Sequence, residues 1–263
     1  MIGKVKAGIK KIATYYTGLP LPLRAALWFT FCNFVLKAIS FITVPIFTRL
    51  IPPNEYGMLS VWSSYETIVV ILATWEIQLG AYTRGLYKFK ESVERFTVSM
   101  HLITNVLTVC FFALVLIFHN AVESFTEMPL SVIGLMFLYM LFRPAYNGWL
   151  TRNRVKFNYK PAVAMTIAYS LVTVLVPLAA VFIIQRTAYV KFSFTLIAAI
   201  IFCLIFWISY LPKYKEAFQN TQQVKQMIKF MVRFEGPLVI HSLSYLILSQ
   251  ADRIMIQKMV GSD

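Results

Sequence analysis

Apolar runs alternate with short polar and basic segments along almost the whole chain. Crossing a bilayer as an α-helix takes about 20 mainly apolar residues, and several of these runs reach that length. The pattern predicts an all-α, polytopic transmembrane helix bundle of about seven spans. We place the spans at residues 23–49, 57–82, 98–119, 130–150, 161–185, 190–211 and 234–259.

Lysine and arginine are distributed unequally between the segments that join these spans. The N-terminal tail and alternate loops hold eighteen of them, and the opposite side of the membrane has four: Arg49, Arg186, Lys191 and Lys258. Because cytoplasmic loops carry the excess of basic residues, we expect the N-terminus in the cytoplasm. In the tail, residues 1–22, lysines combine with apolar residues at helical spacing, which predicts a basic helix lying on the membrane surface.

The composition narrows the class of protein. The 263 residues are 59% hydrophobic with a mean hydropathy of +0.67, which excludes an ordinary soluble domain. The formal net charge is +14, but the basic residues lie between apolar spans, so we expect membrane lipids as partners and not nucleic acid. No predicted extramembrane segment exceeds about 23 residues, whereas domains need about 50, so we do not expect an enzyme.

The cysteines carry no sign of a metal site. Cys32, Cys110 and Cys203 lie far apart in sequence, each inside an apolar run, without the spacing of metal ligands. We therefore expect neither structural disulfides, nor a bound metal, nor a cofactor.

Charged residues inside the predicted spans are the first candidates for function. Lys37 lies near the middle of the first span, where a charge costs at least about 2.5–3.5 kcal/mol. At about 1.5 Å of helix per residue, Glu66 on the next span lies at a similar depth below the outer surface. Glu76 and Arg143 have matching depths from the cytoplasmic side. We therefore predict two charge pairs, Lys37–Glu66 and Glu76–Arg143.

Polar residues share a helical face with several of these charges, as at Asn33, Lys37 and Ser40. A helix beside an aqueous cavity shows this spacing, and so does a bundle held by interhelical hydrogen bonds. The candidate substrate-binding residues are Lys37, Arg143, Arg253, Asn33, Ser40 and Tyr245. The candidates for ion coupling or charge pairing are Glu66, Glu76 and Asp252.

The end of the chain echoes its beginning. TRLIPPN at residues 48–54 aligns with QKMVGSD at residues 257–263 as a basic or polar start, apolar residues and turn residues. Both spans run in the same direction, as in transporters built from two like halves. We predict a six-helix first lobe at residues 23–211, a cytoplasmic linker at 212–233 and the first helix of a second lobe at 234–263. On this interpretation the chain is a fragment that stops early in its second lobe.

Two blocks resemble bacterial polysaccharide repeat-unit flippases of Wzx type. They are FITVPIFTRLIPPNEYGMLSVWSSYE, which begins at Phe41, and EGPLVIHSLSYLILSQADRIMIQKMVGSD, which begins at Glu235. These flippases belong to the multidrug/oligosaccharidyl-lipid/polysaccharide exporter superfamily. The resemblance implies a MATE-like fold in which two six-helix lobes surround a cavity.

The same resemblance implies a function. Such a flippase moves undecaprenyl-pyrophosphate-linked oligosaccharide from the inner to the outer leaflet of the bacterial cytoplasmic (inner) membrane by alternating access, for O-antigen lipopolysaccharide or exopolysaccharide synthesis. The implied partners are the lipid-linked oligosaccharide, a polysaccharide polymerase and a chain-length regulator, with H⁺ or Na⁺ as coupling ion. The alternatives are a multidrug or lipid II exporter of the same superfamily and a non-transporting scaffold of a polysaccharide assembly complex.

Overall fold

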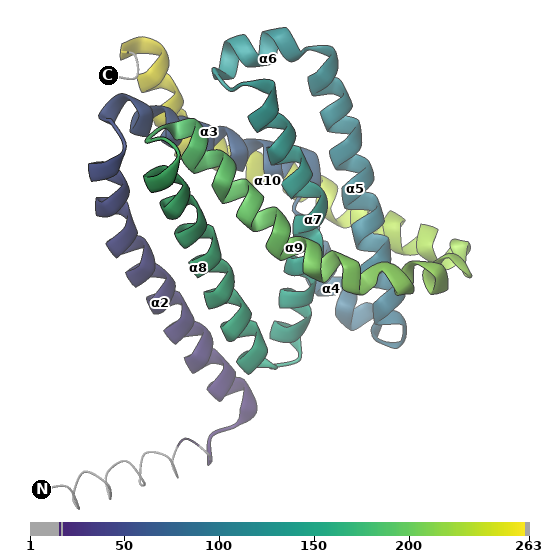
Figure 1. Cartoon of the computed structure of the whole chain (residues 1–263). Helices are drawn as coiled ribbons and strands as arrows, with labels where there is room; N and C mark the ends of the chain where they lie inside the picture. The colour runs from purple at the N-terminus through teal and green to yellow at the C-terminus, as the bar shows by residue number, and fades with distance from the viewer. Residues whose placement is uncertain (1–15, 17, 261–263) are drawn as a thin grey trace, which may run out of the picture.

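The computed structural model describes residue 16 and residues 18–260, and every regular element in this part of the chain is a helix (Figure 1). This confirms the all-α prediction. Most of the predicted surface helix, residues 1–22, lies outside the described residues. The elements are α2 (Leu21–Leu50), α3 (Pro53–Thr74), α4 (Ala81–Lys88), the 3₁₀ turn η1 (Lys90–Ser92), α5 (Val93–Ile117), α6 (His119–Thr126), α7 (Leu130–Val155), α8 (Tyr159–Ile183), α9 (Ala188–Phe218) and α10 (Thr221–Val260).

Six helices are long and apolar enough to cross a membrane, namely α2, α3, α5, α7, α8 and α9. Each of them overlaps one of the first six predicted spans, and the chain is a multi-pass membrane protein. The seventh predicted span, residues 234–259, falls in α10 and is not among the six found in the described part of the chain. Its apolar sequence is interrupted by His241, Gln250, Asp252 and Arg253.

The helices pack around α9, which lies against α7 and α8. The helix α5 packs against α3, α7 and α9, whereas α2 packs mainly along α8 at one flank of the bundle (Figure 1). The largest group of buried apolar side chains lies between α3, α7 and α9, with the Trp62 and Phe192 rings in edge contact at 5.8 Å. In lipid such contacts stabilise by close packing. The position of α2 leaves one of its faces exposed.

The second predicted span, residues 57–82, is interrupted in the structure. The helix α3 ends at Thr74, and Trp75 and Glu76 both have a left-handed backbone with φ of 53° and 46°. Non-glycine residues adopt this conformation rarely, and such strain clusters at functional sites. The Glu76 N–H donates to the Thr74 hydroxyl at 3.2 Å. Glu76 therefore lies in a non-helical break between α3 and α4.

The short helix α4 is held by the beginning of α5. The Tyr82 and Phe96 rings stack with centroids 5.6 Å apart, and the Tyr82 and Thr97 hydroxyl oxygens lie 2.8 Å apart. Gly85 permits this approach, because a Cβ there would lie 2.0 Å from the Phe96 ring. Burial raises the pKa of Tyr82 far above its ordinary value, so the phenol stays protonated.

The predicted linker, residues 212–233, is almost entirely helical, because α9 continues to Phe218 and α10 begins at Thr221. Met227 and Met231 of α10 are fully buried in a cluster with side chains of α4 and α5. The first half of α10 therefore packs onto the bundle formed by the preceding helices, and the division into two lobes stays a prediction.

A buried carboxylate fixes α10 against the break. Glu235 is 6% exposed, and its Oε2 accepts the Ala81 N–H at 2.6 Å, at the N-terminus of α4. A carboxylate is favoured there by the free N–H groups of the helix end. Gly80 leaves the necessary space, because a Cβ would lie 2.6 Å from Glu235 Oε2.

Candidate functional site

Four charged side chains of alternating sign follow one another through the bundle. They are Lys191 of α9, Glu66 of α3, Arg143 of α7 and Glu76 of the break after α3, and all four are partly buried. Electrostatic interactions join Lys191 to Glu66, Glu66 to Arg143, and Arg143 to Glu76. We call these four residues the charge chain.

Arg143 lies among aromatic side chains of α7 and α8. Its guanidinium carbon is 5.8 Å from the centre of the Tyr139 ring, one turn earlier on α7. The Tyr139 and Tyr169 hydroxyl oxygens are 2.9 Å apart, and the Tyr169 ring stacks on that of Tyr146. A cation over a ring face is stabilised by the ring quadrupole, so this aromatic group helps to hold the guanidinium in the interior.

Lys191 joins the charge chain through the start of α9. The Thr187 hydroxyl accepts the Val190 N–H and caps this helix, and Glu55 Oε2 accepts the Ala188 N–H at 2.7 Å. The Lys191 ammonium lies 5.3 Å from the centre of the Phe47 ring. Sequence reasoning placed Lys191 at the outer end of the predicted span 190–211 and counted it only among the outer basic residues. Its place inside that apolar span was the available signal that it belongs with the charged residues of the bundle.

The charges of the chain act on one another across space and not through contact ion pairs. Within the described residues, contact ion pairs join Glu94 to Arg152 and to Lys213, and neither pair includes a residue of the charge chain. Charges of poorly hydrated groups interact over longer distances because the effective dielectric constant around them is low. Both carboxylates act on the same guanidinium, so neutralising either one changes the field at Arg143. No group of three His, Cys, Asp or Glu side chains in the described part is placed to hold a metal ion.

The predicted Lys37–Glu66 pair is wrong. Lys37 is exposed on α2, where it lines a hollow of about 740 Å³ with Phe34, Ser40 and Phe41. The reason is packing: α2 lies along α8, while α7 and α9 bring Arg143 and Lys191 to Glu66. The second predicted pair, Glu76–Arg143, is present as an electrostatic interaction without a contact ion pair between these two described residues.

The uncovered face of α2 is polar as well as apolar. Asn33, Lys37 and Ser40 are all exposed on it, and the exposed rings of Phe34 and Phe41 lie beside them. The Ser40 hydroxyl donates to the Leu36 carbonyl of its own helix at 3.1 Å. A face of this kind does not belong in contact with lipid alone, because an intramembrane lysine needs water or a partner.

The sequence profile of polysaccharide biosynthesis proteins matches residues 23–263. The chain belongs to the polysaccharide biosynthesis protein family. No curated protein and no solved structure matches it.

The remaining predicted site residues of this family member lie on α10. Tyr245 is 71% exposed and projects from the helix. Asp252 and Arg253 lie within α10, but their side chains fall outside the described residues. The structure therefore brings together Glu66, Glu76 and Arg143, and does not bring Asn33, Lys37, Ser40 or Tyr245 to them.

A buried polar stripe on α5 of this family member was missed by sequence reasoning. Thr97, His101, Thr104 and Thr108 are at most 1% exposed and face the other helices. In the described structure His101 Nε2 and Thr104 Oγ1 have no hydrogen-bond partner, and a Cβ at Gly148 would lie 3.7 Å from His101 Nε2. The spacing of 4, 3 and 4 residues was a readable signal for one face of a helix.

Proposed function

We propose that this family member is a flippase that moves undecaprenyl-pyrophosphate-linked oligosaccharide repeat units from the inner to the outer leaflet of a bacterial cytoplasmic membrane by alternating access. The N-terminus lies in the cytoplasm in this proposal. Family membership supports a role in polysaccharide synthesis, and the membrane-spanning helices support a role in transport.

The observation that carries the proposal is the uncovered polar face of α2. The bilayer core excludes a pyrophosphate and a hydrophilic glycan, so the substrate needs a polar surface at membrane depth. Lys37 supplies a positive charge there, and Asn33 and Ser40 supply polar groups on the same face. An ammonium at low dielectric constant interacts strongly with phosphate oxygens. Exposed Phe34 and Phe41 offer apolar surface beside them for the lipid or the sugar faces.

The charge chain is the proposed coupling site. Glu66 and Glu76 share Arg143 between them, so a proton or Na⁺ bound at one carboxylate frees the guanidinium to interact with the other. Because α3, α7 and α9 all contribute residues to the charge chain, this exchange of partners acts on three membrane-spanning helices at once. Such a bistable element is what an alternating-access cycle requires.

The test is translocation by the purified chain in vesicles carrying a fluorescent lipid-linked oligosaccharide. We expect Lys37→Ala to slow translocation about tenfold or more, because a hydrogen bond to a charged group contributes about 1.5–3 kcal/mol. Lys37→Arg should retain most of the rate. The matched control is Lys225→Ala, an exposed lysine on α10, which should leave the rate unchanged.

Other outcomes would assign other functions. Faster movement of lipid II than of lipid-linked oligosaccharide would indicate a lipid II exporter, and export of small organic cations would indicate a multidrug exporter. A wild-type chain that transports none of these but binds a polysaccharide polymerase or chain-length regulator would indicate a scaffold. Equal rates for Lys37→Ala and the wild type would remove Lys37 from the site.

A further inference from the structure

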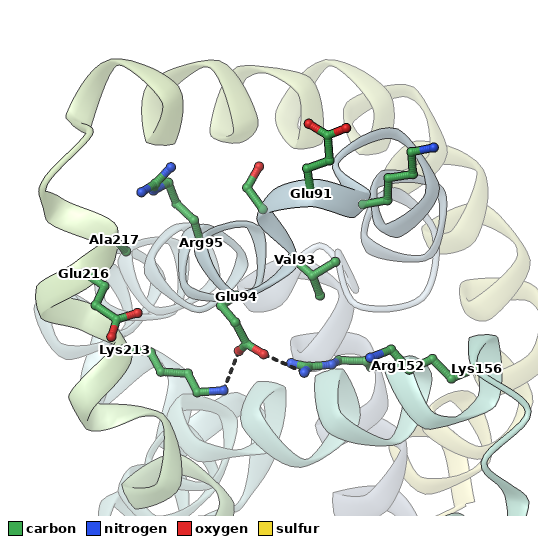
Figure 2. A pocket seen from close by; sticks show the side chains of 11 residues that line it. Glu91, Val93, Glu94, Arg95, Arg152, Lys156, Lys213, Glu216 and Ala217 are labelled. Atoms are coloured by element: carbon green, nitrogen blue, oxygen red, sulfur yellow. Dashed lines mark hydrogen bonds and ion pairs between the residues drawn. The ribbon is translucent and has the colours of Figure 1, made fainter.

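A pocket of about 380 Å³ opens at the end of the bundle where α5 begins and α7 ends (Figure 2). It is distant in sequence from the α2 face, and no residue of the charge chain lines it. Its wall comes from η1, α5, α7 with the residue that follows it, and α9. The lining residues are Lys90, Glu91, Ser92, Val93, Glu94, Arg95, Arg152, Lys156, Lys213, Glu216 and Ala217.

Glu94 organises the cations on one side of this pocket. Its Oε1 lies 2.5 Å from Arg152 Nη2 and its Oε2 lies 2.5 Å from Lys213 Nζ, as the dashed lines in Figure 2 show. One carboxylate therefore holds two cations from two different helices. Five basic residues line the pocket against three carboxylates, Glu91, Glu94 and Glu216, so the pocket as a whole is positively charged.

The N-terminus of α5 forms another part of the wall. Ser92 is the N-cap residue, and in the described structure no side chain caps the first turn. The Ser92 hydroxyl instead accepts a hydrogen bond from Gln223 Nε2 at 3.1 Å. Free N–H groups and the dipole of a long helix favour an anion at this position.

Arg95 is a further basic residue in the wall of the pocket. Its Nη1 donates to Gln223 Oε1, which fixes the guanidinium against α10. Its Nε is buried and has no hydrogen-bond partner in the described part of the chain. The guanidinium therefore adds positive charge to the wall of the pocket, while its Nε stays enclosed by protein atoms.

We propose that this pocket binds a phosphate group carried by an anionic membrane lipid. The pocket lies where membrane-spanning α5 begins and α7 ends, which is the level at which lipid headgroups lie. Lys90 and Lys156 are exposed at the pocket and, unlike Arg152 and Lys213, are not tied to Glu94. They are free to contact phosphate oxygens. The proposal does not depend on which substrate the protein transports.

The test is titration of the purified chain in neutral detergent with short-chain phosphatidylglycerol, followed by thermophoresis. We expect Lys90→Gln/Lys156→Gln to weaken binding about fivefold for each lysine removed, the contribution expected of one basic residue near an anionic surface. Lys90→Arg/Lys156→Arg should bind like the wild type. The matched control is Lys160→Gln/Lys215→Gln, which removes two exposed lysines that do not line the pocket.

Competition separates the two sources of phosphate. If inorganic pyrophosphate does not displace the lipid from the wild type, the pocket binds a lipid headgroup. If it displaces the lipid, and its own binding is lost in Lys90→Gln/Lys156→Gln, the phosphate chemistry holds and the ligand is a soluble one. Equal loss in both lysine pairs, no loss in either, or equal binding of phosphatidylcholine would overturn the proposal. If Lys90→Gln/Lys156→Gln has a lowered melting temperature, the single variant Lys156→Gln decides by the same criteria.

Discussion

At the scale of single residues, the partner of Glu66 is decided by how helices face one another. Lys37 and Glu66 have similar depths along their helices, yet Lys37 lies on the uncovered face of α2. Glu66 instead interacts with Arg143 and Lys191. Depth follows from residue number, whereas direction around the helix axis follows from packing.

A double-mutant cycle distinguishes the two arrangements. We expect Glu66→Gln and Arg143→Gln to be coupled by at least about 0.5 kcal/mol in the free energy of unfolding, because their charges act on each other. Glu66→Gln and Lys37→Gln should add within about 0.5 kcal/mol, because their sites are separate. The measurement is reversible unfolding in detergent. A coupling confined to Glu66 and Lys37 would show that the structural assignment is wrong.

At the scale of elements, α10 belongs partly to the bundle that precedes it. Met227 and Met231 are fully buried, Gln223 bonds to Arg95, and Glu235 accepts the Ala81 N–H. These contacts attach residues 221–235 to α4 and α5. Beyond them Gly236 and Pro237 interrupt the pattern, and Pro237 removes one backbone donor from the helix. Any motion of the end of α10 relative to the bundle is therefore expected to begin there.

Burial along α10 predicts unequal effects of the same substitution. We expect Met231→Ala to reduce the free energy of unfolding by about 2–5 kcal/mol, because it leaves a cavity in a packed cluster. Met259→Ala, at a side chain that is 78% exposed, should change it by no more than about 0.5 kcal/mol. Denaturant titration in detergent measures both. Similar losses at the two methionines would show that residues 221–235 are not packed as described.

At the scale of the whole molecule, segments that are distant in sequence meet at two opposite ends. At one end Glu94 joins α5 to Arg152 of α7 and Lys213 of α9. At the other, Glu55 in the first turn of α3 accepts a hydrogen bond from the Ala188 N–H at the start of α9. These groupings agree with the sides to which the basic-residue distribution assigns these segments.

Labelling from outside the cell tests the orientation. In a Cys110→Ala background, we expect an impermeant maleimide to label Arg186→Cys in intact cells, because this loop lies opposite the basic end. Lys156→Cys should be labelled only after the membrane is opened. The native Cys32 and Cys203 are buried and serve as unreactive internal references. Labelling of Lys156→Cys alone in intact cells would reverse the orientation.

Much of the candidate site was within reach of the sequence. Glu66, Glu76 and Arg143 stand out because charges are rare inside apolar runs, and the 4, 3, 4 spacing from Thr97 to Thr108 identifies a polar face. Lys191 was not identified as a site residue, and the pocket lined by Glu94 was not identified either. Their significance depends on neighbours from other helices, and periodicity along one helix carries no information about those neighbours.

The sequence by itself determined that the chain is all-helical and where six membrane-spanning helices lie, because a bilayer imposes one length on every span. Its basic residues also predicted which segments share a side. Only the tertiary structure decided how each helix is rotated, that α3 breaks before Glu76, and that the predicted linker is helix packed on the bundle. The physical reason is that rotation and breaks follow from close packing between distant segments, which separates Lys37 from Glu66 and brings Lys191 to it.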